Sequence, residues 1–333
     1  MKRPAFVWPL AALLAVLLFN LALTPGFFQI KIQDGRLFGS TIDVVNRSVP
    51  VGLLALGMTL VIATAGVDLS VGAVMAITGA VVACLVARPE GCLLNGIDTG
   101  GNVVAILAIG LVSASACGLF NGMLVAVFRL QPIVATLLLM VAGRGVAQLV
   151  TNGQIVTFEN PAVQSLGNGS WLGLPVPVWI FVAVFAAIAA LSRWTALGLF
   201  IEAVGSNPEA ARLSGLSVSG IRTAVYAVSG VCAGIAGLIT TSDVKAADAN
   251  NAGLYLELDA ILAVAIGGTS MAGGRFSLVG TLFGVLLMQA VSTTVFTRGV
   301  PPEATLVLKA VIVVAVCLLQ SDAIKLRTLR RSV

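Results

Sequence analysis

Glu202-Ala-Val-Gly-Ser-Asn-Pro-Glu-Ala-Ala-Arg-Leu-Ser-Gly-Leu216 is a polar island between apolar segments. Asn207 can accept hydrogen bonds from free N–H groups at a helix start, Pro208 suits the first helical position, and Glu209 places a carboxylate at the positive end of the helix dipole. Gly215 is placed to end that helix. We expect about two turns of helix, too short to be stable alone and therefore held by packing on something else.

The composition excludes a soluble globular protein. Of the 333 residues, 58% are hydrophobic and only 10% are charged, and the mean hydropathy is +1.05. That much apolar surface cannot be buried inside one soluble core. Several windows reach the roughly 20 apolar residues of a membrane-spanning helix, whereas the ~10-residue alternation of an outer-membrane barrel does not occur. The net charge of +5 includes no basic run interleaved with aromatic residues, so a nucleic-acid surface is not indicated. We expect an all-α, polytopic transmembrane helical bundle in the inner membrane.

Hydropathy predicts about ten membrane spans, several of them short or interrupted by glycine. The first follows Lys2 and Arg3 and is too long for the apolar region of a signal peptide. We expect all spans to form one domain over residues 1–333. The predicted spans are residues 6–24, 49–66, 71–86, 103–128, 133–151, 176–191, 223–241, 258–272, 276–297 and 304–320.

Basic residues indicate the orientation, because cytoplasmic loops collect Lys and Arg. With both termini in the cytoplasm, eleven basic residues fall inside and six outside, while Arg144 and Lys309 lie within spans. The inner set is Lys2, Arg3, Arg129, Arg193, Arg212, Arg222, Arg275, Lys325, Arg327, Arg330 and Arg331. The outer set is Lys31, Arg36, Arg47, Arg88, Lys245 and Arg298. This topology places residues 202–216 in the cytoplasm and residues 25–48, 87–102, 152–175 and 242–257 outside.

Several kinds of chemistry are not indicated. The five cysteines have no C-x-x-C spacing and lie mostly in apolar segments, which favours packing over a disulfide framework or metal site. Histidine is absent, which removes the commonest metal ligand and general base. No Gly-Lys pair occurs, so there is no G-x-x-x-x-G-K-[ST] loop to cradle phosphates. We expect this chain to bind no metal or cofactor of its own, and an ATP-driven process would need another polypeptide.

Two glycine-rich stretches interrupt apolar segments, at Gly66-Val-Asp-Leu-Ser-Val-Gly72 and Ile266-Gly-Gly-Thr-Ser-Met-Ala-Gly-Gly-Arg275. Broken helices in corresponding halves often flank a transport pathway. Asp68 is expected to be the N-cap of a helix beginning at Ser70. The alternative is a gating or pathway carboxylate.

A second candidate for the pathway is a polar stripe on one predicted helix. Thr136, Met140, Arg144 and Gln148 recur at i, i+4 spacing, which puts three polar side chains on one face. A guanidinium inside a span costs about 3 kcal/mol or more unless it faces a cavity or a partner. The stripe either lines a transport path or ties Arg144 to a carboxylate in the bundle core.

An acidic, amide-rich segment is predicted outside the membrane. It is either a solvated loop or a contact for a soluble partner. Glycosidase chemistry is not favoured, because the i, i+2 spacing of Glu257 and Asp259 does not place them on one helical face. The segment contains Asp243, Asp248, Asn250, Asn251, Tyr255, Glu257 and Asp259.

The motifs together resemble a known family. Glu209-Ala-Ala-x-x-x-Gly215 resembles the ATPase-docking loop of bacterial ABC importer permeases. Gly66–Gly72, Gly205–Gly215, Leu256-Glu-Leu-Asp-Ala-Ile261 and Ile266–Gly274 resemble, in that order, the ribose-type monosaccharide permeases of ABC importers. Gln33-Asp-Gly-Arg-Leu-Phe-Gly39 and Ala246-Ala-Asp-Ala-Asn-Asn-Ala-Gly253 are most similar to permeases of galactofuranose importers.

The resemblance implies the membrane subunit of an ATP-driven monosaccharide importer. Residues 202–216 would dock a separate ATPase that carries ATP and Mg, and a periplasmic sugar-binding protein would deliver the sugar. A second permease, the same or a related chain, would complete the path. The docking residues would be Asn207, Glu209, Ala210, Ala211 and Gly215; the path or gate would include Asp68, Thr136, Arg144 and Gln148; Asp248, Asn250, Asn251 and Tyr255 would face the binding protein.

Two other hypotheses remain open. An ion-coupled secondary sugar transporter would use Asp68 or Arg144 to couple sugar movement to an ion and would need no ATPase. A membrane-embedded enzyme would need clustered catalytic residues at one interface, and the sequence shows no nucleophile with a plausible base.

Overall fold

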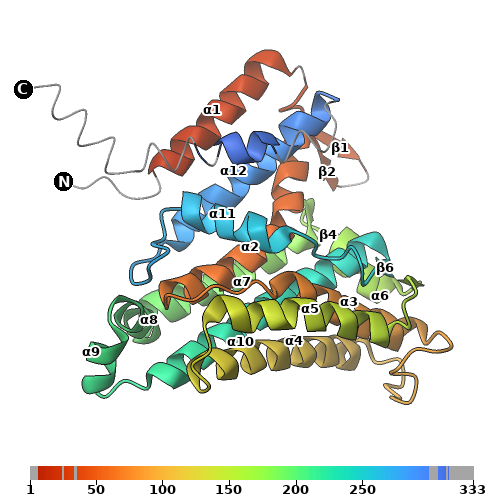
Figure 1. Ribbon diagram of the computed structural model, residues 1–333. Coiled ribbons are helices and arrows are strands. Elements are labelled where there is room, and N and C mark those ends of the chain that lie inside the picture. Colours follow the sequence, from red (N-terminus) through yellow and green to blue (C-terminus); the bar gives the residue numbers. More distant parts are fainter. Residues whose placement is uncertain (1–6, 25, 34–35, 300–306, 313, 315–333) are drawn as a thin grey trace, which may run out of the picture.

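The predicted helical class is confirmed by the structure, a computed structural model that describes residues 7–24, 26–33, 36–299, 307–312 and 314 (Figure 1). Most of the described residues are helical, and short strand pairs lie in the connections. The helices are α1 (Val7–Leu23), α2 (Ser40–Ala63), α3 (Val71–Ala87), α4 (Val103–Ala126), α5 (Pro132–Val150), α6 (Pro161–Asn168), α7 (Val176–Trp194), α8 (Leu197–Ser206), α9 (Pro208–Leu213), α10 (Val218–Val244), α11 (Leu256–Ile266) and α12 (Leu278–Thr297).

The strands form three antiparallel pairs. Each pair is short, so together they fasten connections rather than build a layer. The pairs are β1 (Lys31–Gln33) with β2 (Arg36–Phe38), β3 (Val156–Thr157) with β6 (Ala246–Ala247), and β4 (Ser170–Trp171) with β5 (Leu174–Pro175).

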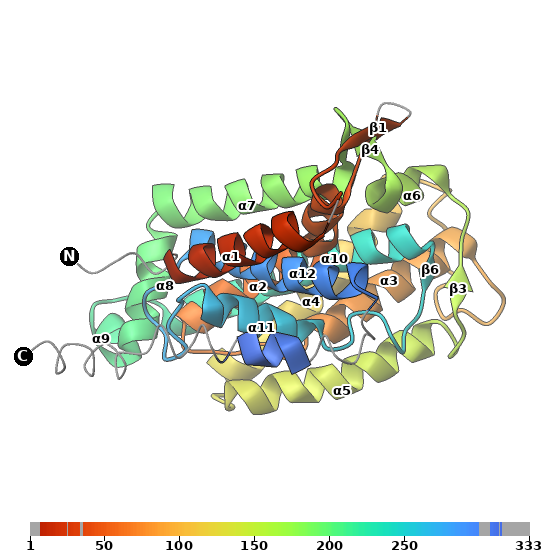
Figure 2. The same cartoon turned by 90° about the horizontal axis from the view of Figure 1, so that it is seen from above.

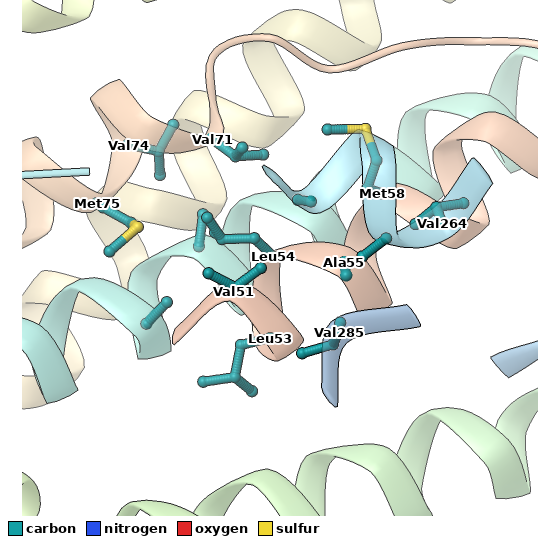
Figure 3. Close-up of a cluster of buried hydrophobic side chains, with 14 of the residues drawn as sticks. Val51, Leu53, Leu54, Ala55, Met58, Val71, Val74, Met75, Val264 and Val285 are labelled. Carbon is teal, nitrogen blue, oxygen red and sulfur yellow. The ribbon is translucent and has the colours of Figure 1, made fainter. Parts of the chain in front are cut away.

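The core forms around α3 and the part of α2 from Val49 onward, which are predominantly apolar on every side. From Val49 to Ala63 the side chains of α2 are buried apart from Pro50, which is half-buried. A helix that is hydrophobic all round belongs inside a bundle. Leu54 and Met58 of α2 belong to the same buried cluster as Val74 and Met75 of α3 (Figure 3). Figure 2 shows α5 and α7 on opposite flanks, where many of their apolar side chains are exposed.

Helices α4 and α10 cross so closely that side chains are excluded at the contact. A Cβ on Gly118 would lie 2.4 Å from the carbonyl oxygen of Tyr226, and one on Gly230 would lie 2.5 Å from that of Ala114. Both helices carry G-x-x-x-G spacing, at Gly118–Gly122 and Gly230–Gly234. In lipid, helices associate through such small residues because the hydrophobic effect does not drive them together.

Most predicted spans coincide with helices, and two boundaries are corrected. Helix α2 begins at Ser40 rather than residue 49, because Asp43, Asn46 and Arg47 lower the hydropathy without preventing a helix. Helix α11 ends at Ile266 rather than 272, because two Gly-Gly pairs break the chain there. The tenth predicted span, 304–320, lies largely outside the described residues. Within the described ranges, six helices are long and apolar enough to cross a membrane: α2, α4, α5, α7, α10 and α12.

The connections gather at two ends of the bundle. All six strands and α6 lie at one end, the strand end, while α8 and α9 lie at the other, the α9 end (Figures 1 and 2). Backbone contacts join the connections at the strand end, where β3 pairs with β6 and the Leu37 N–H donates to the carbonyl of Gly173 over 2.9 Å. Three of the four connections predicted outside, residues 25–48, 152–175 and 242–257, thus meet at one end.

The interpretation of the cysteines as packing residues was wrong for one pair. Cys84 and Cys92 form a disulfide with a Cα–Cα distance of 6.1 Å. Helix α3 ends just after Cys84, and Arg88 and Gly91 adopt positive φ values that return the chain to it. A separation of eight residues matches no known cysteine motif, so the sequence did not predict this disulfide. The turn after α3 brings the two cysteines together.

Candidate functional site

The polar island folds as predicted around α9. The side chain of Asn207 accepts a hydrogen bond from the Ala210 N–H over 3.0 Å, and Pro208 occupies the first turn. At the other end Gly215 has φ +85°, the Leu216 N–H donates to the Ala211 carbonyl, and the Gly215 N–H donates to that of Arg212. This 6→1 and 5→2 pattern is a Schellman motif. The sequence therefore encoded both ends of this helix.

The outer face of α9 is open. Ala211 is buried, whereas Glu209 and Ala210 are exposed and Leu213 is 74% exposed. Glu209 pairs with Arg212 over 2.6 Å, and this hydrogen bond holds the pKa of the Glu209 carboxyl below its usual value. A six-residue helix with an exposed leucine has little to stabilise it within the chain. The arrangement suits docking against a second protein.

Gly205, just before α9, joins the polar island to the bundle. A Cβ at this position would lie 1.8 Å from the carbonyl oxygen of Ala63 and 2.5 Å from the amide nitrogen of Gly274. The Gly274 N–H itself donates to the Ala63 carbonyl over 2.9 Å. The end of α8, the end of α2 and the second glycine-rich stretch thus meet backbone to backbone. Gly205 contacts the second glycine-rich stretch directly and the first through the end of α2 that precedes it.

Asp68 is the centre of a buried polar cluster between α2 and α3. One carboxylate oxygen accepts from the Ser70 N–H at 3.1 Å and from the Ser70 hydroxyl at 2.6 Å, and the other accepts from the Ser229 hydroxyl at 3.0 Å. The side-chain amide of Asn121 donates to the Ser70 hydroxyl over 2.8 Å. The cluster joins the turn before α3 to α4 and α10.

The predicted capping role of Asp68 is confirmed, since its carboxylate accepts from the Ser70 N–H at 3.1 Å while the Ser70 side chain makes no capping hydrogen bond. The regular helix α3 begins at Val71, one residue later than predicted, after the turn of residues 64–70. The carbonyl of Val67 in this turn accepts from the hydroxyls of Tyr226 at 3.3 Å and Thr136 at 3.4 Å. Side chains from α5 and α10 therefore clamp the broken helix.

The polar stripe on α5 binds connections at two levels. Thr136 reaches the turn near Asp68, whereas the Arg144 guanidinium donates to the carbonyls of Ala249 and Ala252 at 3.2 and 2.5 Å. The Gln148 amide donates to the side-chain oxygen of Asn250 over 2.6 Å. The direct partners of Arg144 are backbone carbonyls, so the alternative that ties Arg144 directly to a carboxylate is not observed, and the pathway role stays a prediction.

The outer segment of residues 248–255 is ordered by its own side chains. Asp248 accepts from the N–H groups of Asn250 and Asn251 at 2.9 and 3.2 Å and from the Asn251 side-chain amide at 2.7 Å. The last of these bonds contributes most to lowering the pKa of the Asp248 carboxyl. Tyr255 is 59% exposed and follows Gly253, which packs against Gly72 at the start of α3. The predicted partner-facing residues thus form one turn beside an exposed aromatic ring.

The second predicted intramembrane charge also has a partner. The Lys309 ammonium lies 2.7 Å from the Asp259 carboxylate, with both side chains largely buried. This pair removes Asp259 from the solvated segment to which the sequence analysis assigned it. The attraction between the two charges offsets part of the hydration that each loses on burial.

A cavity of about 590 Å³ lies beside α9 at the α9 end. Gly66 and Tyr226 line it on the side of the Asp68 cluster, and Arg129, Arg212 and Arg222 contribute positive charge. The cavity connects the surface near the polar island with the clamped turn. Its lining includes residues of the polar island and of the turn before α3, so these two candidate regions lie beside the same cavity.

Sequence reasoning missed several residues of this site. Asn121, Ser229 and Tyr226 lie in apolar segments where single polar residues gave no periodic pattern. Asn121 lies between Gly118 and Gly122, the two glycines of a helix-contact motif. A polar residue at that position could have indicated from the sequence that Asn121 faces another helix. Gly205 was quoted within a motif, but its backbone contact depends on two segments distant in sequence.

Comparison with known proteins gives a consistent result. The family described as "Branched-chain amino acid transport system / permease component" matches residues 40–317. The chain is 52% identical to the galactofuranose transporter permease protein YtfT of Escherichia coli, over 95% of this chain and 91% of that protein. It is 41% identical to the fructose import permease protein FruF of Bifidobacterium longum, over 88% and 80% of the two chains. It is 38% identical to the ribose import permease protein RbsC of Escherichia coli, over 94% and 92%.

No solved structure matches the chain. The family match covers most of the described helices, and the relatives are transport permeases rather than enzymes, which agrees with a transport role. The apolar helices agree with a multi-pass membrane protein. The chain belongs to the branched-chain amino acid transport system permease family, and it is a sugar-importer type of ABC permease.

Proposed function

We propose that this chain is the permease subunit of an ABC importer that carries galactofuranose across the bacterial inner membrane. The 52% identity to a galactofuranose permease over nearly the whole chain supports this substrate. The observation that carries the mechanism is the exposed helix α9 connected through Gly205 to the ends of α2 and the second glycine-rich stretch. The family implies an ATPase and a substrate-binding protein as partners.

The proposed topology has ten crossings of one domain over residues 1–333, with both termini in the cytoplasm. The α9 end then faces the cytoplasm and the strand end faces the periplasm. The Cys84–Cys92 disulfide supports this orientation, because structural disulfides persist in oxidising compartments such as the periplasm. A membrane-impermeant reductant followed by an impermeant maleimide, applied to spheroplasts, should label this pair; labelling that requires lysis would contradict the orientation.

The mechanism follows from the contacts at the α9 end. The ATPase, which carries ATP and Mg, grips residues 202–216, with Asn207, Glu209, Ala210, Ala211 and Gly215 forming or shaping the docking helix. Closure of the ATPase subunits moves α9, and Gly205 passes this movement to Ala63 and Gly274. The turn around Asp68, clamped by Thr136, is the element that changes between outward- and inward-facing states.

At the strand end the permease meets the sugar-binding protein. Asp248, Asn250, Asn251 and Tyr255 form the contact, and Arg144 and Gln148 of α5 hold that turn in place. Loading or release of the binding protein would thereby act directly on α5. A second permease, identical or related, would complete the path across the membrane.

The docking proposal is tested by purification of the tagged permease from native membranes. An ATPase should copurify with the parent and be lost from Glu209→Lys and Gly215→Val at equal expression. Glu159→Lys is the matched control, since it reverses an exposed charge at the strand end. Loss from no variant would contradict docking at α9. Absence of an ATPase from every sample, with uptake that collapses with the proton or sodium gradient, would favour an ion-coupled transporter.

A further inference from the structure

A separate polar hollow lies toward the strand end of the bundle, away from α9 and the Asp68 cluster. Its volume is about 270 Å³, and its walls come from α2, α6, α7, α10 and α12. Helices from both halves of the sequence therefore contribute to it. The polar side chains that line it are Asn46, Arg47, Thr240, Asp243 and Gln289.

Two of the polar side chains around this hollow lack protein partners in the described part of the chain. The side-chain oxygens of Asn46 and Thr240 are buried and have no hydrogen-bond partner among the residues that the structure describes. Arg47 and Asp243 carry opposite charges, yet neither takes part in a salt bridge within the described ranges. Buried polar groups in folded proteins are nearly always satisfied, so these two unmet oxygens call for a ligand or water.

The chemistry of the lining selects a small, neutral, hydroxyl-rich molecule. The hollow is smaller than the roughly 300–1,000 Å³ of sites for drug-sized ligands. The charges of Arg47 and Asp243 cancel, which disfavours a ligand with net charge. The Asn46 oxygen and the Asp243 carboxylate accept hydrogen bonds, while Arg47 donates them. A sugar hydroxyl can both donate and accept, and therefore satisfies both kinds of group.

We propose that this hollow is a monosaccharide-binding site within the permease, occupied on the strand side before translocation. The inference rests on the proposed function as a sugar importer and adds the residues that contact the sugar. The sugar hydroxyls donate to Asn46 and Asp243, accept from Arg47, and exchange hydrogen bonds with Thr240 and Gln289.

Thr240→Val is the most informative variant. The threonine hydroxyl has no protein partner among the described residues, so its removal with conserved shape should leave the fold intact. Ser242→Ala is the matched control. Its hydroxyl is also buried without a partner in the described chain, on the same helix, but it does not line the hollow. Asp243→Asn tests the carboxylate with nearly unchanged volume.

Binding is measured on the purified permease in lipid nanodiscs by saturation-transfer NMR, with D-galactose, D-ribose and L-leucine as probes at millimolar concentration. We expect signals from sugar but not leucine, and a weakening of about 2–10-fold in Thr240→Val. Asp243→Asn should weaken binding at least as much, whereas Ser242→Ala should match the parent. Size-exclusion elution of each variant verifies the fold.

Three outcomes would overturn the site. They are no sugar signal from the parent, a signal from leucine alone, and equal sugar signals from the parent and both lining variants. ATPase copurification of the same variants is measured in parallel, since it depends on α9 and not on the hollow. Retained copurification with unaltered sugar binding would refute this site and leave the proposed function standing.

Discussion

Replacing Gly205 with alanine should impair transport without detaching the ATPase. The docking helix α9 keeps its own caps in this variant, because Asn207 and Gly215 are unchanged. The altered contact lies one step further into the bundle, where α8 meets α2 and the second glycine-rich stretch. The substitution thus separates docking of the ATPase from transmission of its movement.

The magnitude follows from the distances at the junction. A Cβ on residue 205 would lie 1.8 Å from the carbonyl oxygen of Ala63, whereas ordinary contact begins near 3.4 Å, so α8 must move about 1.6 Å from α2. Both nearest groups are backbone, and no side chain can rotate away. Overpacking costs about 1–3 kcal/mol, and the threatened Gly274–Ala63 hydrogen bond contributes about 0.5–1.5 kcal/mol. We expect a loss of about 2–4 kcal/mol in the free energy of unfolding.

The assay uses the permease reconstituted in liposomes with its ATPase and binding protein. Sugar uptake per ATP hydrolysed should fall in Gly205→Ala, together with the temperature of unfolding, while the ATPase still copurifies. Gly145→Ala in α5 is the control, since a Cβ there meets nothing within 4 Å. Parental stability and uptake in Gly205→Ala would refute the junction, and loss of the ATPase would refute the separation of docking from transmission.

Other substitutions test the remaining clusters. Asp68→Asn puts a donor among the donors of its cluster and should lower the unfolding free energy by about 1–3 kcal/mol; an unchanged midpoint of thermal unfolding would argue against the cluster as a clamp. Asn207→Ala should lower the stability of α9 by about 1 kcal/mol and weaken ATPase copurification, whereas Asn207→Asp should preserve both. Equal ATPase recovery with the two variants would show that the cap does not contribute to docking. In Arg144→Lys the ammonium cannot reproduce the guanidinium geometry at the Ala249 and Ala252 carbonyls, so the affinity for the binding protein, measured with a biosensor, should fall. An affinity equal to that of the parent would contradict the role of Arg144 in holding this turn. The pKa of Asp248 is below its unfolded value, so the stability from its turn is present at neutral pH and is lost only as pH falls through the lowered pKa; affinity should therefore be constant from about pH 7 to about pH 5, and a decline over that range would contradict it.

The local features of this fold could be predicted from sequence. The caps of α9 depend on residues a few positions apart, and Asn207, Pro208 and Gly215 have the expected roles. Hydropathy located most helices because each apolar run is also a local feature, contiguous in the sequence. It failed at α2, where Asp43 and Arg47 lie in the first turns of a longer helix.

The candidate site was harder to predict, because its contacts join distant segments. Thr136 and Arg144 share one face of α5, as the spacing predicts, but the two reach turns that are far apart in the chain. Periodicity reveals the face of a helix and does not identify what lies opposite. For the same reason, the Asp68 cluster and the polar hollow could be seen only in three dimensions.

The crossing of α4 and α10 makes these two helices a single stiff lever. Their backbones meet at Gly118 and Gly230 with no side chains between them to slide or compress. Four residues separate the end of α9 from the start of α10, and the pair carries Ser229 and Asn121 of the Asp68 cluster. If α9 is the docking helix proposed above, we expect a displacement of the start of α10 to move α4 with it and to reach the buried carboxylate through these two side chains.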